Sequence, residues 1–203
     1  MRWVVSVLAA AAMAAAPGSS VGRETVLELN GPVLVELTTA SGVIEISVDR
    51  AHAPVSAANF LRYVRGGFYD GGVFHRTVRP DNQPQNNVKI EVVQAGINPA
   101  RLKDEFPPIP LERTSVTGLR HLDGTLSMAR AEPDTATSDF FICIGDQPEL
   151  DFGGRRNPDG QGFAAFGRVV KGMDVVRRIQ ASPAQGQSLT PPVAILSAKV
   201  AGN

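Results

Sequence analysis

Cysteine is nearly absent from this chain of 203 residues, and its one cysteine excludes an internal disulfide and any metal site built from several cysteines. Charge of one sign is lacking too, because 20 Lys and Arg balance 20 Asp and Glu. No basic excess is therefore available to bind nucleic-acid phosphates. The remainder is ordinary globular composition, with 43% hydrophobic residues, and this length most naturally forms one domain. The 20 glycines and 15 prolines favour turns and short strands over a helical bundle.

The common catalytic motifs are also missing, including G-x-S-x-G, H-E-x-x-H and the P-loop. His52, His75 and His121 are scattered without metal-ligand spacing and are predicted to be structural. Cys143 lies in the apolar run FFICIG, which predicts a buried and inert thiol. The acidic segment 146–159 lacks the ligand spacing of a calcium loop and is interpreted as a solvated loop. No metal and no cofactor are predicted.

The N-terminus has the layout of a secretory signal peptide, with Arg2 before an uncharged apolar run and small residues after it. We expect residues 1–20 to be this signal, cleaved between Ala14 and Ser20, and residues 24–203 to form the domain. A buried N-terminal helix is the alternative. The run is shorter than the roughly 20 residues that span a bilayer, so no retained anchor is expected. Export without disulfides favours the periplasm, with secretion as the alternative.

Hydrophobic periodicity predicts two helices, at 53–65 and 172–181, because apolar residues recur there at helical spacing. Short β-branched runs separated by Gly- and Pro-containing segments predict strands. They fall at 33–38, 43–48, 73–78, 88–95, 125–129, 139–144, 163–170 and 193–200. Many short strands with two helices predict a mainly β fold, a closed antiparallel barrel with helices at its ends.

Five collinear motifs carry a resemblance to a known family. They are FHR at 74–76, VQAG at 93–96, GTLSMAR at 124–130, ATSDFFI at 136–142 and FGRVVKGMDVV at 166–176. In these motifs, and over roughly residues 33–200, the chain resembles the cyclophilins, which are peptidyl-prolyl cis-trans isomerases. Its ending, PPVAILSAKV, is similar to that of the short exported bacterial members. The resemblance implies an eight-stranded antiparallel barrel capped by two helices, with the substrate on an outer face.

The resemblance also implies site residues. The catalytic arginine of the family falls on Arg76, its substrate-binding glutamine on Gln94, and the phenylalanine that floors its proline pocket on Phe141. Leu150 matches a leucine of the pocket wall. The other substrate-binding positions fall on Val92, Ala129, Arg130, Asp139 and Phe163. Catalysis by a fixed guanidinium needs neither nucleophile nor metal, which agrees with the missing motifs.

The chain departs from the family at several of these positions. Asp139 replaces a common glutamine, and Arg130 stands where many members carry asparagine. Phe163 replaces a pocket histidine, and Glu149 replaces the tryptophan of cyclosporin-sensitive members, so weak cyclosporin binding is expected. The pocket phenylalanine that normally precedes the glutamine has Glu91 as its nearest equivalent.

Three functions remain open at this stage. The first is an isomerase that accelerates X-Pro rotation and assists the folding of exported proteins. The second is a proline-peptide binder or chaperone with little catalysis, and the third is a barrel that holds a small apolar ligand, as lipocalins do. Bulky strand residues predict a filled interior, which disfavours the third. The expected partners are unfolded or flexible proline-containing polypeptides, without nucleic acid or stable membrane insertion, and the expected state is a monomer.

Overall fold

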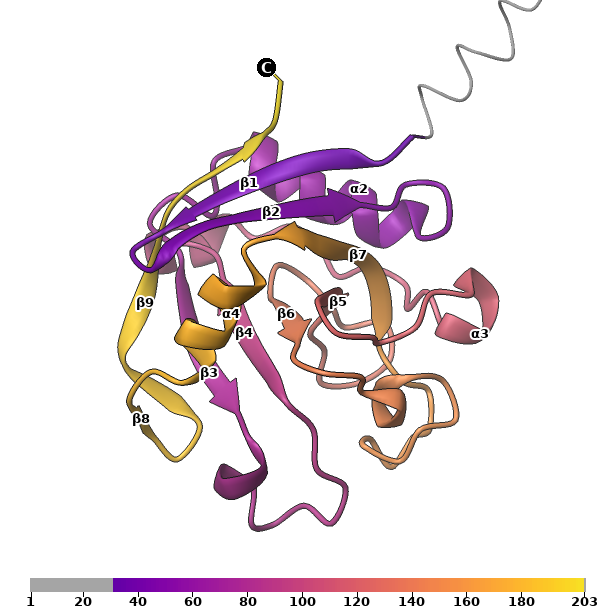
Figure 1. The fold of residues 1–203 in the computed structure, drawn as a ribbon. Helices are drawn as coiled ribbons and strands as arrows, with labels where there is room; N and C mark the ends of the chain where they lie inside the picture. Colours follow the sequence, from indigo (N-terminus) through magenta and orange to yellow (C-terminus); the bar gives the residue numbers. More distant parts are fainter. Residues whose placement is uncertain (1–30, 203) are drawn as a thin grey trace, which may run out of the picture. The chain divides into compact units, whose positions relative to one another are not determined.

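The computed structural model describes residues 31–202, and the proposed signal lies outside the described residues. Within this described part, nine strands form one antiparallel sheet (Figure 1). They are β1 (Val33–Thr39), β2 (Gly42–Val48), β3 (Val73–Val78), β4 (Val92–Gly96), β5 (Thr125–Met128), β6 (Phe140–Cys143), β7 (Ala164–Lys171), β8 (Ala184–Gln185) and β9 (Ser188–Val200).

The strand order closes the sheet into a barrel. Neighbours run β1-β2-β7-β5-β6-β4-β3-β9, and β1 pairs with β9 to complete the ring. Eight strands therefore make the barrel, as the resemblance implied. The two-residue β8 was not predicted, and it pairs only with the start of β9 as a small hairpin beside the ring.

The two longest helices of the described residues, α2 (Pro54–Arg65) and α4 (Met173–Gln180), pack on the barrel. The ends of each helix lie within one residue of the predicted bounds. The α2 helix contacts β7 and β9, whereas α4 contacts β2, β3 and β4. A distant carboxylate caps α2, because Glu112 accepts hydrogen bonds from the backbone N–H groups of Val55 and Ser56 at 2.9 and 2.7 Å. These groups have no partner within the helix, and a negative charge is favourable at its N-terminus.

The remaining helices are short. They are α3 (Thr114–Thr117) and the 3-10 turns η1 (Pro80–Asn82), η2 (Pro99–Asp104) and η3 (Pro148–Leu150). Within the described residues no helix is long and apolar enough to cross a membrane.

An inner cluster of apolar side chains fills the barrel. Its largest members include Phe60 from α2, Phe140 from β6 and Phe166 from β7, all with no exposed surface. The ring centroid of Phe60 lies 5.3 Å from that of Phe140 and 5.2 Å from that of Phe166. Rings packed at this spacing are in direct contact. The filled interior agrees with the prediction from bulky strand residues and argues against a barrel that holds a ligand.

A second, outer cluster lies on the opposite face of β3, β4 and β6. Its buried members are Val78, Ile90, Val92, Phe141, Cys143 and Leu150, with Ala129 and Phe163 packed against them. Successive strand residues face opposite sides of a sheet, so Phe140 belongs to the inner cluster and Phe141 to the outer one. Cys143 is fully buried here, as predicted, and burial raises the pKa of its thiol.

Two strands differ from their predicted bounds by more than one residue. The β4 strand begins at Val92 rather than 88, because the side chain of Gln83 takes the place of a partner strand. Its Nε2 donates to Ile90 O at 2.6 Å and its Oε1 accepts from Ile90 N at 3.3 Å. The β9 strand begins at Ser188 rather than 193, and its pairing with β3 jumps from Val193 to Ser188. The prolines at 191 and 192 fall in this jump, since they have no N–H to donate to a ladder.

Candidate active site

One row of residues crosses four adjacent strands on the outer face. Arg76 of β3 pairs with Gln94 of β4, Gln94 with Phe141 of β6, and Phe141 with Ser127 of β5. Cross-strand partners on one face have neighbouring side chains. The register therefore brings together four residues that are separated in the sequence.

A β-bulge turns Arg76 to this face. Phe74 points into the inner cluster, and alternation alone would send Arg76 to the same side. The pairings of β3 with β4 and with β9 both shift between Phe74 and Arg76, which leaves His75 as the extra residue. Such an insertion re-aims the side chains that follow it. Arg76 thus faces outward, together with Val78 of the outer cluster.

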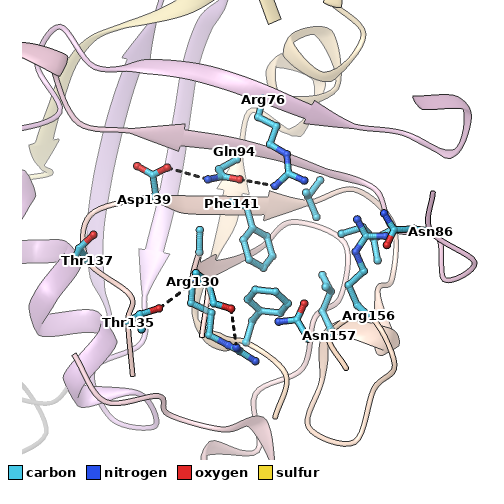
Figure 2. A pocket seen from close by; sticks show the side chains of 16 residues that line it. Arg76, Asn86, Gln94, Arg130, Thr135, Thr137, Asp139, Phe141, Arg156 and Asn157 are labelled. Atoms are coloured by element: carbon cyan, nitrogen blue, oxygen red, sulfur yellow. Dashed lines mark hydrogen bonds between the residues drawn. The ribbon is translucent and has the colours of Figure 1, made fainter. Parts of the chain in front are cut away.

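Two amide oxygens hold the Arg76 guanidinium. Gln187, just before β9, accepts from Arg76 Nε at 2.9 Å and from Nη2 at 2.6 Å. Gln94 accepts from Nη1 at 3.1 Å, and its own Nε2 donates to Asp139 Oδ2 at 2.9 Å, as Figure 2 shows. Burial lowers the pKa of Arg76, although a guanidinium stays charged at any physiological pH. The arrangement is a fixed cation beside an apolar surface.

An open cavity of about 530 Å³ lies next to this guanidinium. All nine predicted site residues line it: Arg76, Val92, Gln94, Ala129, Arg130, Asp139, Phe141, Leu150 and Phe163. Its apolar floor and wall are Phe141 and Phe163, whose rings meet edge to face with centroids 5.3 Å apart, and Leu150, which is fully buried. A small apolar ring fits such a niche, and the polar groups stand at its edge.

A buried polar network supports Phe141 from behind. The His121 ring stacks on the Phe141 ring, with centroids 6.0 Å apart and planes 17° apart. Its Nε2 lies 2.9 Å from Ser127 Oγ and its Nδ1 lies 2.7 Å from Asp151 Oδ1. His121 is 1% exposed, so its role is structural, as predicted. Burial acts to raise the pKa of Asp151, but hydrogen bonds from His121 outweigh it and hold that pKa below its usual value.

The Arg130 side chain belongs to the wall of the cavity. Its guanidinium is almost fully buried and binds both Asp159 oxygens, at 2.7 and 3.0 Å. It also donates to Gly162 O and lies 5.0 Å from the centre of the Phe163 ring. Its charge is thus neutralised by Asp159. Two carboxylates of segment 146–159, Asp151 and Asp159, therefore brace the site, and the prediction of a merely solvated loop was wrong for them.

Asp139 stands at the polar edge. Its Oδ2 accepts from Gln94 and lies 3.1 Å from His75 Nε2. The carboxylate is seated against Gly96, where a Cβ would come within 2.4 Å of Oδ1. Glycine at position 96 therefore makes room for the aspartate.

The register near Glu91 needs correction. Glu91 does not line the cavity, because its carboxylate accepts a hydrogen bond from Gln180 Nε2 at the end of α4. Ile90 lines it instead, on the same side as Val92 and Gln94. The two-residue period of a strand would have indicated this.

Glu149 lies outside the cavity lining, in an exposed ion pair with Arg155. Weak cyclosporin binding stays a prediction.

Several further residues of the site were not predicted from the sequence. Asn86, Arg156 and Asn157 line the cavity from loops, and Gln187 is 111 residues from the arginine it holds. Nothing in the local sequence marks these positions. Among residues 31–202 no group of three His, Cys, Asp or Glu side chains is placed to hold a metal.

The fold and the site together define a class: a filled antiparallel barrel that presents a polar-edged apolar niche, with a fixed arginine, on its outside. Comparison with known proteins agrees. The family model for cyclophilin type peptidyl-prolyl cis-trans isomerases matches residues 34–200. The peptidyl-prolyl cis-trans isomerase A of Dickeya dadantii is 40% identical over 174 residues, covering 82% of this chain and 83% of that protein.

Two further relatives extend the comparison. The peptidyl-prolyl cis-trans isomerase B of Escherichia coli is 36% identical over 72% of this chain and 84% of its own length. A cyclophilin-type isomerase of Cryptosporidium parvum, solved with the dipeptide Ala-Pro, has a TM-score of 0.67 over 84% of this chain and 99% of its own, at 20% identity. That last similarity shows the fold alone. The chain belongs to the cyclophilin-type peptidyl-prolyl cis-trans isomerase family, and its enzyme class is isomerase.

Proposed function

We propose that this protein accelerates cis–trans isomerisation of X-Pro bonds in proteins that fold after export, with Arg76 as the catalytic residue. The observation that carries the proposal is the Arg76 guanidinium, fixed by Gln187 and Gln94 at the edge of the apolar niche. The niche residues Phe141 and Leu150 bury the proline ring, while Gln94 holds a backbone carbonyl.

Amide resonance resists rotation of the X-Pro bond with a barrier of about 18–20 kcal/mol. The uncatalysed change therefore takes roughly tens to hundreds of seconds. In the twisted transition state the proline nitrogen becomes pyramidal and regains its lone pair. A hydrogen bond from Arg76 to that lone pair exists only in the twisted state, so it lowers the barrier rather than tightening ground-state binding.

Fixing the guanidinium in advance strengthens this effect. The two amide oxygens on Arg76 are neutral, so they orient the fork of donors without cancelling its charge. Lowering the barrier by about 4–7 kcal/mol would bring the rate to roughly 10–1,000 per second. No bond is broken, so the step consumes no co-substrate.

The decisive experiment compares wild type with Arg76→Ala in a tetrapeptide isomerisation assay. We expect kcat/KM to fall by about 10²–10³ on loss of the transition-state donor. Arg168→Ala is the matched control, because Arg168 is exposed on β7 and lines no part of the cavity. If wild type and Arg76→Ala both match the uncatalysed rate, the enzyme proposal fails and the alternative, a proline-peptide binder, takes its place.

The N-terminal sequence supports the export part of the proposal, because Arg2 and the apolar run after it have the layout of a signal peptide. Expression of the full chain in a bacterium, followed by fractionation and mass measurement, tests this part. We expect a shortened chain in the periplasm that begins between Ala14 and Ser20. A full-length chain in the cytoplasm would overturn the assignment, and a shortened chain in the medium would favour secretion.

A further inference from the structure

The two ends of the cavity differ in charge. Figure 2 shows Asp139 at one end and Arg156, with Asn86 and Asn157 beside it, at the other. Phe141 lies between them, at the floor of the niche. An extended peptide whose proline sits on Phe141 therefore has one flank near a carboxylate and the other near a guanidinium.

Arg156 has no anionic partner within the described chain. Its Nη1 donates to Gln83 Oε1 at 2.8 Å and to Val88 O at 2.7 Å, and both acceptors are neutral. No carboxylate of residues 31–202 lies within ion-pair distance of it. Its sequence neighbour Arg155, in contrast, pairs with Glu149 at 2.7 Å.

The other donors of Arg156 remain available. No hydrogen bond to a described residue uses its Nε or Nη2, whereas Nη1 ties the side chain to two fixed oxygens. Nε and Nη2 form the edge of a guanidinium that binds a carboxylate with two parallel hydrogen bonds. The side chain is therefore anchored at one nitrogen and open at the edge suited to an anion.

The surroundings make this cation costly to leave unpaired. Burial, followed by the nearby charge of Arg76, lowers the pKa of Arg156. Arg76 itself is bound by two neutral amides rather than by a carboxylate. Two partly desolvated positive charges thus share one side of the cavity without an internal counter-ion, and an anion from outside would relieve both the desolvation and the repulsion.

We infer that Arg156 forms an anion-binding subsite for the side chain of a substrate Asp or Glu that flanks the proline. The inference rests on the proposed function and names its substrate class: X-Pro segments with an acidic residue on the flank that reaches Arg156. The Asp139 carboxylate at the opposite end disfavours an acidic residue on the other flank.

Peptides that differ at one flanking position test the inference in wild type. The isomerisation rate is measured by exchange NMR for a neutral peptide with Gln on both flanks, and for peptides with Glu before the proline, Glu after it, or Lys at either position. We expect one of the two Glu peptides to exceed the Gln peptide by about three- to ten-fold in kcat/KM, as for a single partly shielded charge pair. The Lys peptide with the same flank should fall below the Gln peptide.

Variants then assign the preference to one side chain. Arg156→Gln should reduce the Glu-to-Gln ratio to about one, while Arg156→Lys, which keeps the charge, should retain part of it. Arg155→Gln is the matched control and should keep the wild-type ratio, because Arg155 is exposed and paired outside the cavity lining. Raising the salt concentration should shrink the ratio in wild type but not in Arg156→Gln.

The neutral peptide separates the two proposals. If even the Gln peptide isomerises at the uncatalysed rate, the proposed function fails. If the Gln peptide is accelerated but neither Glu peptide is preferred in wild type, the subsite is overturned while the isomerase stands. This wild-type result decides the matter even if Arg156→Gln does not fold. A preference that survives in a folded Arg156→Gln also overturns the assignment.

Discussion

The inner and outer apolar clusters share strands β3, β4 and β6 and differ in what surrounds them. The inner cluster is closed and packs mainly apolar side chains, with aromatic rings at its centre. The outer cluster is smaller, opens to solvent at the cavity, and is bordered by charged and amide groups. One face of β3, β4 and β6 therefore packs into the barrel core, while the other face contributes to the cavity. The alternation of strand residues separates these two tasks within single elements.

The largest expected difference lies between two adjacent phenylalanines. Phe140→Ala leaves a cavity in the closed inner cluster and should cost about 3–5 kcal/mol of unfolding free energy. Phe141→Ala opens a surface that water can reach, so the loss should be nearer 2 kcal/mol, from reduced burial alone. Its isomerase activity should nevertheless fall more than about tenfold, because the floor of the proline niche is gone. Urea unfolding and the peptide assay measure the two effects.

Equal losses of stability for the two variants, with equal activity per folded molecule, would remove the distinction between the clusters. Val78→Ala gives a control on the outer side, since Val78 belongs to the outer cluster but does not line the cavity. It should lose stability without the specific loss of activity that we expect for Phe141→Ala.

A smaller effect is expected at Gln187, which holds two nitrogens of the Arg76 guanidinium. Gln187→Ala should lower kcat by about tenfold, the loss of roughly one positioning hydrogen bond, with little change in KM. Gln187→Glu keeps an acceptor at this place but offsets the charge of Arg76, so it should restore only part of kcat. A variant that raised KM alone, or that Glu could not rescue, would show that Gln187 does not position the arginine.

The smallest effect concerns pH, and it should appear only in the polar support of the outer cluster. The pKa of Asp151 is below its unfolded value, so its stabilising contribution is present above about pH 4 and is lost as the pH falls through the folded pKa. Asp151→Asn should cost about 1 kcal/mol at pH 7, since a charge-assisted hydrogen bond to His121 becomes neutral.

Melting curves of this variant and wild type should therefore converge below about pH 4. Asp81→Asn is the control, because Asp81 is exposed and distant from this network, and it should leave the pH dependence as it is in wild type. A wild-type advantage over Asp151→Asn that persists unchanged at low pH would exclude this linkage.

Much of the fold could be predicted from the sequence. The helices at 54–65 and 173–180 follow from apolar spacing, and β3 was predicted at its observed bounds. These elements depend on local patterns that tertiary contacts do not override. The site residues came from the family resemblance instead, and the structure brings all nine to one cavity.

The rest depends on contacts between distant segments. Gln83 replaces a strand partner for Ile90, which shortened β4 relative to its predicted length. Gln187 and Arg156 reach the site from loops, whose paths no periodicity predicts. The bulge at His75 could not be predicted from the sequence either, because an extra strand residue does not change the composition of the apolar run at 73–78.

That single extra residue has a consequence for how this barrel tolerates change. If His75 were paired in a regular register instead of bulging, plain alternation would turn the Arg76 cation toward Phe74 and the apolar interior of the barrel, where an ion without a counter-ion is poorly tolerated. Exchanging side chains on the rim, in contrast, leaves the lumen untouched. The bulge in the β3 backbone is thus less tolerant of change than the side chains that surround the cavity. Ligand preference can therefore diversify while the barrel stays the same.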